Sequence, residues 1–228
     1  MGVFIKLFQF LLWPWLNRKF KDFSAASAKD NSQPHFEVER KYGLSKEEFD
    51  GMPGRLRALG LSKKSDATIL DTFIPAEIDG DMIRVRDETS NAITVTVITL
   101  KEWVDVDGSR ERKERESGPI DTISRETFLA LGRRLAGTEL MSFSKERATF
   151  SGYRDKRKVT VALDLVSGLG TYSGTYLEIE LIVERQEDVA EARAFVEKFA
   201  VELIGSEREF AMSYMEMLKR SRQEQKKN

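Results

Sequence analysis

The sequence predicts an α+β fold in which about eight β-strands form an antiparallel barrel or a strongly curved sheet, with helices packed outside. The first reason is that about eight segments have strand-like patterns and follow one another with mostly short connections. The second is that one face of nearly every segment is charged, which a dry protein core does not tolerate. A water-filled tunnel that holds a polyanion and its cations would tolerate these charges.

Composition narrows the chemistry that such a tunnel can use. The chain has 228 residues and a net charge of −1, from 37 basic and 38 acidic residues. It therefore has no overall basic field, and we expect no DNA partner. The absence of cysteine excludes disulfides and thiolate metal sites, and the single histidine, His35, excludes a multi-histidine zinc site within one chain. Any metal must be held by oxygen, which favours magnesium, manganese or calcium.

Residues 1–33 form a separate segment that ends in a short polar linker. Residues 3–16 are nearly all apolar but fall short of the ~20 residues that a transmembrane helix needs. Trp13 and Trp15 favour an anchor at the membrane interface, made by residues 3–21, because a basic cluster follows them: Arg18, Lys19 and Lys21. The alternatives are docking on the body of the protein and a processed peptide. We expect a cytoplasmic protein, with peripheral membrane contact if the anchor forms.

The first strand of the folded region carries the most informative pattern. In residues 36–42, strand alternation places Glu37, Glu39 and Lys41 on one face and apolar side chains on the other. Near the other end of the chain, residues 176–181 repeat the pattern with Glu178 and Glu180. Two carboxylate pairs on strands far apart in the sequence suggest a divalent-cation site that the fold closes.

The segments that follow the first strand alternate between a helix and further strands. Ser45 and Glu48 match a capping box at the start of a helix over residues 45–60, which Pro53 and Gly54 are expected to break or restart. The next strands are expected over residues 67–74, 81–87, 92–103 and 110–116.

The second half continues with a helix that Ser124 is expected to cap. Two strands over residues 139–150 and 158–165 are expected to turn around Ser151 and Gly152. A helix near the C-terminus has one apolar face, made of Val189, Ala192, Val196, Phe199, Ala200 and Leu203.

The last expected helix begins at a capping box formed by Ser206 and Glu209, and it places Phe210, Tyr214 and Leu218 together. We expect the main domain to span residues 34–220 and a charged tail to span residues 221–228.

The charged motifs occur in an order that resembles CYTH domains, also called triphosphate tunnel metalloenzymes. The resemblance is close over residues 34–184 and loose over the C-terminal helices. The motifs are Glu37-x-Glu39-x-Lys41, Arg84-x-Arg86, Thr99-Leu100-Lys101, Arg112-x-Glu114-x-Glu116, Lys145-x-Arg147, Asp164 with Gly168-Leu169-Gly170, and Glu178-x-Glu180.

This resemblance implies a closed antiparallel tunnel that binds a triphosphate-containing small molecule together with Mg²⁺ or Mn²⁺. Carried over by position, the metal ligands would be Glu37, Glu39, Glu116, Asp164, Glu178 and Glu180. The groups that bind phosphate oxygens would be Lys41, Arg84, Arg86, Lys101, Arg112, Lys145 and Arg147. Catalysis would depend on Glu39 and Lys41, with Glu39 placed to activate water.

The function that the resemblance implies is metal-dependent hydrolysis of inorganic triphosphate or of a small organic triphosphate. One alternative is a class IV adenylyl cyclase, which uses the same tunnel but attacks the α-phosphorus. Another is a polyphosphate-binding or nucleotide-binding module without catalytic activity, tethered to a membrane.

Overall fold

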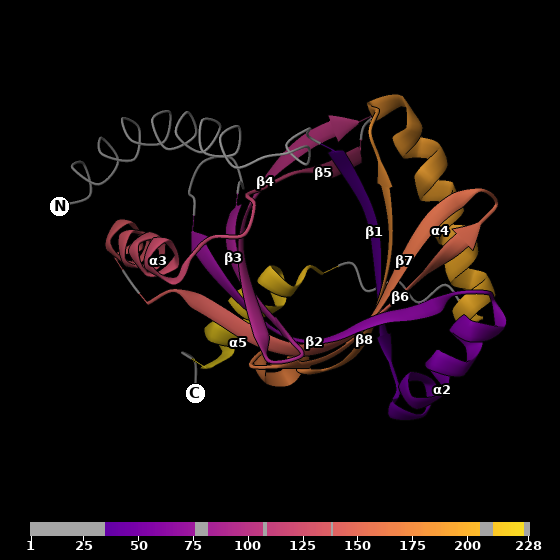
Figure 1. Ribbon diagram of the computed structural model, residues 1–228, viewed down its shortest axis with the longest axis horizontal. Coiled ribbons are helices and arrows are strands. Elements are labelled where there is room, and N and C mark those ends of the chain that lie inside the picture. The colour runs from indigo at the N-terminus through magenta and orange to yellow at the C-terminus, as the bar shows by residue number, and fades with distance from the viewer. Residues whose placement is uncertain (1–34, 76–81, 107–108, 138, 206–211, 226–228) are drawn as a thin grey trace.

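Eight antiparallel strands curl into a barrel in the order β1-β5-β4-β3-β2-β6-β7-β8 (Figure 1). The computed structural model describes residues 35–75, 82–106, 109–137, 139–205 and 212–225; the predicted membrane anchor lies outside them. The strands are β1 (His35–Leu44), β2 (Ser62–Pro75), β3 (Met82–Ser90), β4 (Ile93–Val106), β5 (Ser109–Glu116), β6 (Met141–Arg154), β7 (Arg157–Ser167) and β8 (Gly174–Val183).

The barrel closes along a short seam between β1 and β5. β1 pairs with β8 from Phe36 to Leu44, but it pairs with β5 only at His35, Phe36 and Glu37. Beyond Glu37, this edge of β1 has no β5 partner among the described residues, so the sheet is open there. The predicted eight-stranded antiparallel sheet with helices is confirmed, whereas closure is partial and does not follow the whole length of a tunnel.

Helices pack around the barrel. They are α2 (Lys46–Ala58), α3 (Thr122–Ala136), α4 (Val189–Ile204) and α5 (Tyr214–Gln225). In Figure 1, α4 runs along β1 and α3 lies beside the opposite part of the sheet. The last helix, α5, contacts β6 and the short 3-10 helix η1 (Gly170–Tyr172). None of the described helices combines the length and the apolar composition needed to cross a bilayer.

Apolar side chains fill the space between the sheet and the helices. The predicted apolar face of α4 is confirmed, because all of its members are buried, and it packs against Val38 of β1 and Ile179 of β8. A second cluster joins α5 to Phe143 and Tyr176, and a third joins α3 to β2, β3 and β4. Each large apolar side chain buried in this way contributes about 1.5–3 kcal/mol. The first and third clusters lie outside the barrel, whereas the second lies on its inward face, where Phe143, Tyr214 and Met215 line the cavity. The rest of the inward face is available for charge.

The first helix keeps its predicted capping box but not its predicted break. The Glu48 N–H donates to Ser45 Oγ at 3.2 Å, and the Ser45 N–H donates to Glu48 Oε2 at 2.8 Å. The helix runs through Pro53 to Ala58 without interruption. The φ angle of proline is helical, so the cost is confined largely to one missing backbone donor and local crowding.

Two other local predictions are wrong. Asp121, and not Ser124, is the N-cap of α3, because the Ser124 N–H donates to Asp121 Oδ1 at 2.8 Å. The hairpin of β6 and β7 turns at Asp155 and Lys156, whose φ angles of 47° and 66° suit a tight hairpin turn.

The predicted turn at Ser151 and Gly152 lies inside β6 instead. At Gly152 a Cβ atom would lie 2.8 Å from the Gly60 carbonyl oxygen. Glycine at position 152 therefore allows the backbones of two neighbouring segments to approach closely, and it does not form a turn.

The C-terminal capping box of Ser206 and Glu209 lies outside the described residues. The helix itself is described from Tyr214 to Gln225, so it extends beyond residue 220, where we expected the charged tail to begin. Ser221 is buried within this helix.

Candidate active site

The inward faces of the strands line a cavity of about 1020 Å³. Strand alternation places the predicted charged residues on this face, as expected from a period of two. Of the predicted site residues, those that line the cavity are Glu37, Glu39, Lys41, Arg84, Arg86, Lys101, Glu116, Lys145, Arg147, Glu178 and Glu180. The fold thus brings together charged side chains from β1, β3, β4, β5, β6 and β8.

Two predicted residues are placed differently. Asp164 does not line the cavity, because it is fully enclosed behind Lys145 and Arg147. Arg112 lies in β5 opposite Glu37, but its side chain is outside the described part of the structure. The metal role predicted for Asp164 and the phosphate role predicted for Arg112 both stay predictions.

One wall of the cavity is acidic and only weakly compensated. Glu39 of β1 lies opposite Glu180 of β8 in the sheet register, and Glu37 projects from the same strand face. Glu37 Oε2 is buried without a hydrogen-bond donor among the described groups, and Lys101 Nζ lies 3.7 Å away. Burial, followed by the neighbouring charge of Glu37, raises the pKa of the Glu180 carboxyl well above its usual value. A bound cation would relieve this repulsion.

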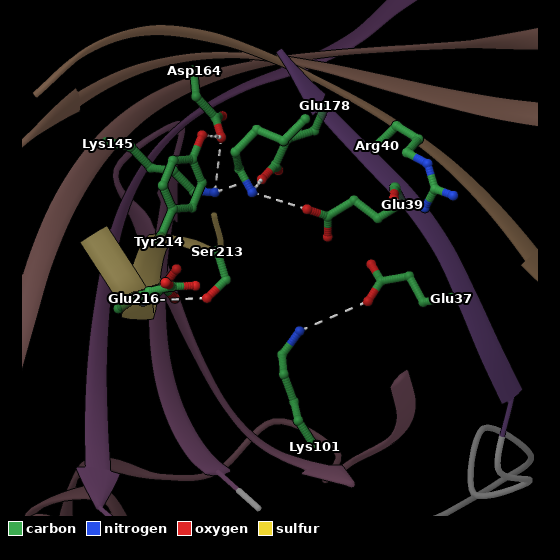
Figure 2. A network of polar contacts seen from close by, with 12 residues as sticks. Glu37, Glu39, Arg40, Lys101, Lys145, Asp164, Glu178, Ser213, Tyr214 and Glu216 are labelled. Atoms are coloured by element: carbon green, nitrogen blue, oxygen red, sulfur yellow. Dashed lines mark hydrogen bonds and ion pairs between the residues drawn. The ribbon is translucent and has the colours of Figure 1, made fainter. Parts of the chain in front are cut away.

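The donor set suits a hard divalent cation because its atoms are carboxylate oxygens. The fit is chemical and not yet geometric: no three acidic or histidine side chains in the described ranges are gathered closely enough to hold a metal ion as they stand. Figure 2 shows Glu37 and Glu39 extending from β1 into the same space, while Arg40 points away from it. Small side-chain rotations would therefore be needed for these carboxylates to share an ion.

Lys41 lies between the acidic wall and the cationic end of the cavity. Its Nζ atom lies 2.9 Å from Glu39 Oε1 and 2.6 Å from Glu178 Oε1. Burial alone would lower the pKa of Lys41, but the charges of Glu178 and Glu39 raise it above its usual value. Lys41 is therefore a charged ammonium that faces the cavity.

The cationic end is a dense and mutually compensated network. Asp164 accepts from Lys145 Nζ at 2.9 Å and from Arg147 Nε and Nη2 at 2.6 Å each. Arg147 also contacts Glu178. Burial opposes ionisation of Glu178, but Lys145, Lys41 and Arg147 hold its pKa well below the usual value. The same burial, with the charge of Arg147, lowers the pKa of Lys145.

Arg84 and Arg86 on β3 provide further hydrogen-bond donors to the cavity. Arg84 Nη2 donates to Thr99 Oγ1 at 3.0 Å and to Glu116 Oε1 at 3.4 Å. Its Nε atom is buried without an acceptor in the described part of the chain. Arg86 makes a bidentate pair with Asp71 at 2.8 and 2.9 Å. A buried arginine donor without an acceptor is a suitable contact for an anionic ligand.

Lys101 is paired within the same region of the cavity. It contacts Glu114, a buried residue of β5. Burial would raise the pKa of Glu114, but Lys101 and its other neighbours lower it to about 2. An ionised Glu114 keeps Lys101 beside the acidic wall, where Figure 2 shows it directed toward Glu37.

Sequence reasoning missed several residues of the cavity, among them Asp71 and Tyr214. Asp71 is 2% exposed and lines the cavity beside Arg86; the available signal was the one charged residue within residues 67–75. Tyr214 lines the cavity from α5, and its hydroxyl donates to Asp164 at 2.9 Å. No local pattern identifies Tyr214, because its position depends on how the C-terminal helix docks.

Comparison with known proteins gives this cavity a family context. The CYTH domain model matches residues 35–214, which is more than half of the chain. No curated protein matches the sequence. Among solved structures, the chain is similar to the PH1819 protein of Pyrococcus horikoshii OT3, with a TM-score of 0.63 and 26% identity over 81% of this chain and 99% of the other.

Two further structures share the fold. The PH1012 protein of Pyrococcus horikoshii OT3 has a TM-score of 0.58 and 22% identity over 80% of this chain and 99% of the other. HpAC1 from Hippeastrum, a candidate adenylyl cyclase with a dominant triphosphatase activity, has a TM-score of 0.55 and 18% identity. The aligned region covers 82% of this chain and 95% of HpAC1.

Proposed function

Because the chain belongs to the CYTH family, we propose that it is a divalent-metal-dependent hydrolase of inorganic triphosphate or of a small organic triphosphate. The observation that carries this proposal is the pairing of opposite charges inside one cavity. An acidic wall that contains Glu37, Glu39 and Glu180 faces the same space as a large group of cationic side chains. These cations are Lys41, Arg84, Arg86, Lys101, Lys145 and Arg147.

A triphosphate matches the charge of such a site. It carries roughly four negative charges near neutral pH, and its oxygens accept charge-assisted hydrogen bonds from lysine and arginine. Arg84 has a buried Nε donor that is still without an acceptor among the described groups. We assign Arg84, Arg86 and Lys101 to phosphate oxygens on one side, and Lys145 and Arg147 to phosphate oxygens on the other.

We assign Mg²⁺ or Mn²⁺ to the acidic wall, where Glu37, Glu39 and Glu180 would hold it. A divalent cation bound there supplies charge neutralisation and orientation for the phosphate oxygens. The support is the carboxylate donor set, the orphaned Glu37 Oε2 atom and the raised pKa of Glu180. For Asp164 and Glu178, to which the resemblance gave a metal role, we propose instead that they hold the cationic side chains, because lysine and arginine donors already surround them.

The proposed reaction is an in-line attack of water on the terminal phosphorus. Glu39 orients the water and accepts its proton, a new bond forms between the water oxygen and phosphorus, and the bond to the bridging oxygen breaks. Inorganic triphosphate then gives phosphate and pyrophosphate. Lys41, which bridges Glu39 and Glu178, stabilises negative charge as it moves to the leaving group.

A substrate panel tests this proposal. Tripolyphosphate, thiamine triphosphate and nucleoside triphosphates are incubated with Mg²⁺, with Mn²⁺ or with EDTA, and phosphate, pyrophosphate and cyclic AMP are quantified. Metal-dependent release of phosphate supports the hydrolase. Cyclic AMP with pyrophosphate would identify a cyclase instead, and tight binding without any turnover would identify a binding module.

A further inference from the structure

Tyr214 is a cavity residue to which the proposed reaction gives no role. It is the first residue of α5, its side chain is buried, and it lines the cavity next to Ser213 and Met215. Figure 2 shows its ring beside Lys145 and its hydroxyl directed toward Asp164. A side chain from the C-terminal helix therefore reaches the phosphate-binding end of a site that is otherwise built mainly from strands.

The face of the Tyr214 ring carries two ammonium groups. Lys41 Nζ lies 3.9 Å from the ring centroid, and Lys145 Nζ lies 4.8 Å from it. Both distances are within the range of cation–π attraction, which strengthens when the groups are removed from water, and both lysines are buried. The ring therefore attracts lysines from two different strands, β1 and β6, to one point.

The ring supplies attraction without adding a negative charge. Three cations, Lys41, Lys145 and Arg147, already contact three carboxylates, Glu39, Glu178 and Asp164. A further carboxylate in place of the ring would add a negative charge that repels phosphate. An aromatic face holds the ammonium groups in place while leaving their charge available to a ligand.

The Tyr214 hydroxyl contacts the same network through Asp164. It donates to Asp164 Oδ2 at 2.9 Å, the atom that also accepts from Lys145 Nζ. Burial and the charges of Glu178 and Asp164 raise the pKa of Tyr214 well above its usual value, so the hydroxyl keeps its proton and remains a donor. Asp164 is thus fixed by a neutral group as well as by cations.

Contacts outside the charged network fix the position of Tyr214. Its ring packs against Phe143 and Tyr176, with centroid distances of 5.1 and 5.5 Å. Farther along α5, Glu224 accepts hydrogen bonds from Thr171 Oγ1 at 3.0 Å and from the Tyr172 hydroxyl at 3.2 Å. The helix is therefore anchored on η1 independently of the cavity, and the ring can serve as a fixed support.

We propose that Tyr214 is a positioning residue that holds the ammonium groups of Lys41 and Lys145 toward the phosphates of the substrate. The inference rests on the proposed function, because it names a residue that prepares the same site. Lys41 and Lys145 already contact Glu178 and Asp164. Without the ring, the carboxylates alone would set the positions of both ammonium groups and would draw them away from the phosphates.

Titration calorimetry with tripolyphosphate in EDTA tests this role without turnover. Tyr214→Leu and Tyr214→Met remove the aromatic face while keeping an apolar side chain, and Tyr214→Phe keeps the face but loses the hydroxyl. We expect the dissociation constant to rise about tenfold in the first two variants, equivalent to about 1.4 kcal/mol. Tyr214→Phe should recover most of the affinity, to within about threefold of the wild type.

Leu218→Ala is the matched control for loosening of α5. Leu218 is buried in the same apolar cluster but does not line the cavity. We expect this variant to bind tripolyphosphate within about twofold of the wild type. Equal weakening by Leu218→Ala and Tyr214→Leu would reduce Tyr214 to a packing role and overturn the inference.

The remaining outcomes separate the two proposals. Wild-type binding with unchanged affinity in Tyr214→Leu would overturn the role of Tyr214 alone. A wild-type protein that binds tripolyphosphate neither in EDTA nor with Mg²⁺ would overturn the proposed function and this inference together. If Tyr214→Leu does not fold, as judged by circular dichroism, Tyr214→Met provides the decisive comparison.

Discussion

Glu178 and Glu180 lie two residues apart on the same face of β8, yet their surroundings are opposite. Glu178 is surrounded by Lys41, Lys145 and Arg147, which hold its pKa well below the usual value. Glu180 is half-buried beside Glu37, and removal from water together with the charge of Glu37 raises its pKa well above the usual value. The cavity therefore has a strongly compensated end around Glu178 and a weakly compensated wall around Glu180.

This difference indicates that the two regions of the cavity have different roles. Where every carboxylate has cationic partners, the ion pairs fix side chains before any ligand arrives, which is the preorganisation that electrostatic catalysis requires. Where carboxylates crowd one another, the protein carries a repulsion that a bound cation would remove. The folded state thus bears an electrostatic cost at the place where we propose that metal binds.

The matched pair Glu178→Gln and Glu180→Gln tests this comparison most strongly. Glu178→Gln leaves buried cations without their partner and should lower the free energy of unfolding by about 3–5 kcal/mol. Glu180→Gln removes a repelling carboxylate, so metal-free stability should stay the same or increase. Urea denaturation in EDTA measures both. Equal destabilisation by the two variants would show that the two ends do not differ.

Glu37→Gln and Glu39→Gln address the function of the weakly compensated wall. Each removes a proposed metal ligand, so we expect turnover to fall at least about 100-fold, while the thermal unfolding midpoint stays near that of the wild type. The measurement is phosphate release from tripolyphosphate at saturating Mg²⁺. Glu184→Gln is the control, because Glu184 also lines the cavity but is not a proposed ligand. Near-normal turnover in either variant would refute the assignment.

Arg84→Ala and Lys101→Ala test the cationic contribution to substrate binding. Each change removes a charge-assisted contact and should weaken tripolyphosphate binding by about 1.5–3 kcal/mol. The stabilisation of each variant by increasing tripolyphosphate, followed as a thermal shift, reports this loss. Arg125→Ala is the control, because Arg125 pairs with Asp87 and does not line the cavity. If ligand stabilises both cavity variants as much as the wild type, phosphate binds elsewhere.

Much of the site could be predicted because strand alternation is a local property. The period of two places Glu37, Glu39 and Lys41 on one face without any knowledge of the neighbouring strands. The same rule places Asp164 on the inward side of β7, but it does not reveal that Lys145 and Arg147 enclose it. Enclosure depends on side chains from a neighbouring strand.

The remaining features depend on contacts between distant segments. Tyr214 joins the site only because α5 docks on η1 and β6, which no pattern near residue 214 encodes. The opposite pKa shifts of Glu178 and Glu180 arise from neighbours on other strands, although both residues share one motif. The short β1–β5 seam likewise depends on how two strands far apart in the chain diverge.

Asp71 and Arg86 form another ion pair of the cavity, which the sequence analysis did not predict. Burial opposes its ionisation, but Arg86 holds its pKa below the usual value of about 3.9. A carboxyl whose pKa is lowered in the folded state contributes stability above the pKa of the unfolded chain. That contribution is lost as the pH falls through the folded-state pKa. Asp71 should therefore stabilise the protein at neutral pH and cease to do so in acid.

Asp71→Asn gives this expectation a measurable form. The amide keeps one oxygen acceptor for Arg86 but loses the charge, so we expect a loss of about 1–2 kcal/mol in the free energy of unfolding at pH 7. The difference from the wild type should persist down to about pH 4 and shrink below it, because the Asp71 carboxyl of the unfolded chain then becomes protonated while that of the folded protein does not. Asp66→Asn, an exposed change on the same strand, is the control and should show little effect. Urea denaturation at several pH values measures the difference, and a gap that stays constant into acid would mean that Asp71 acts through packing and not through its charge.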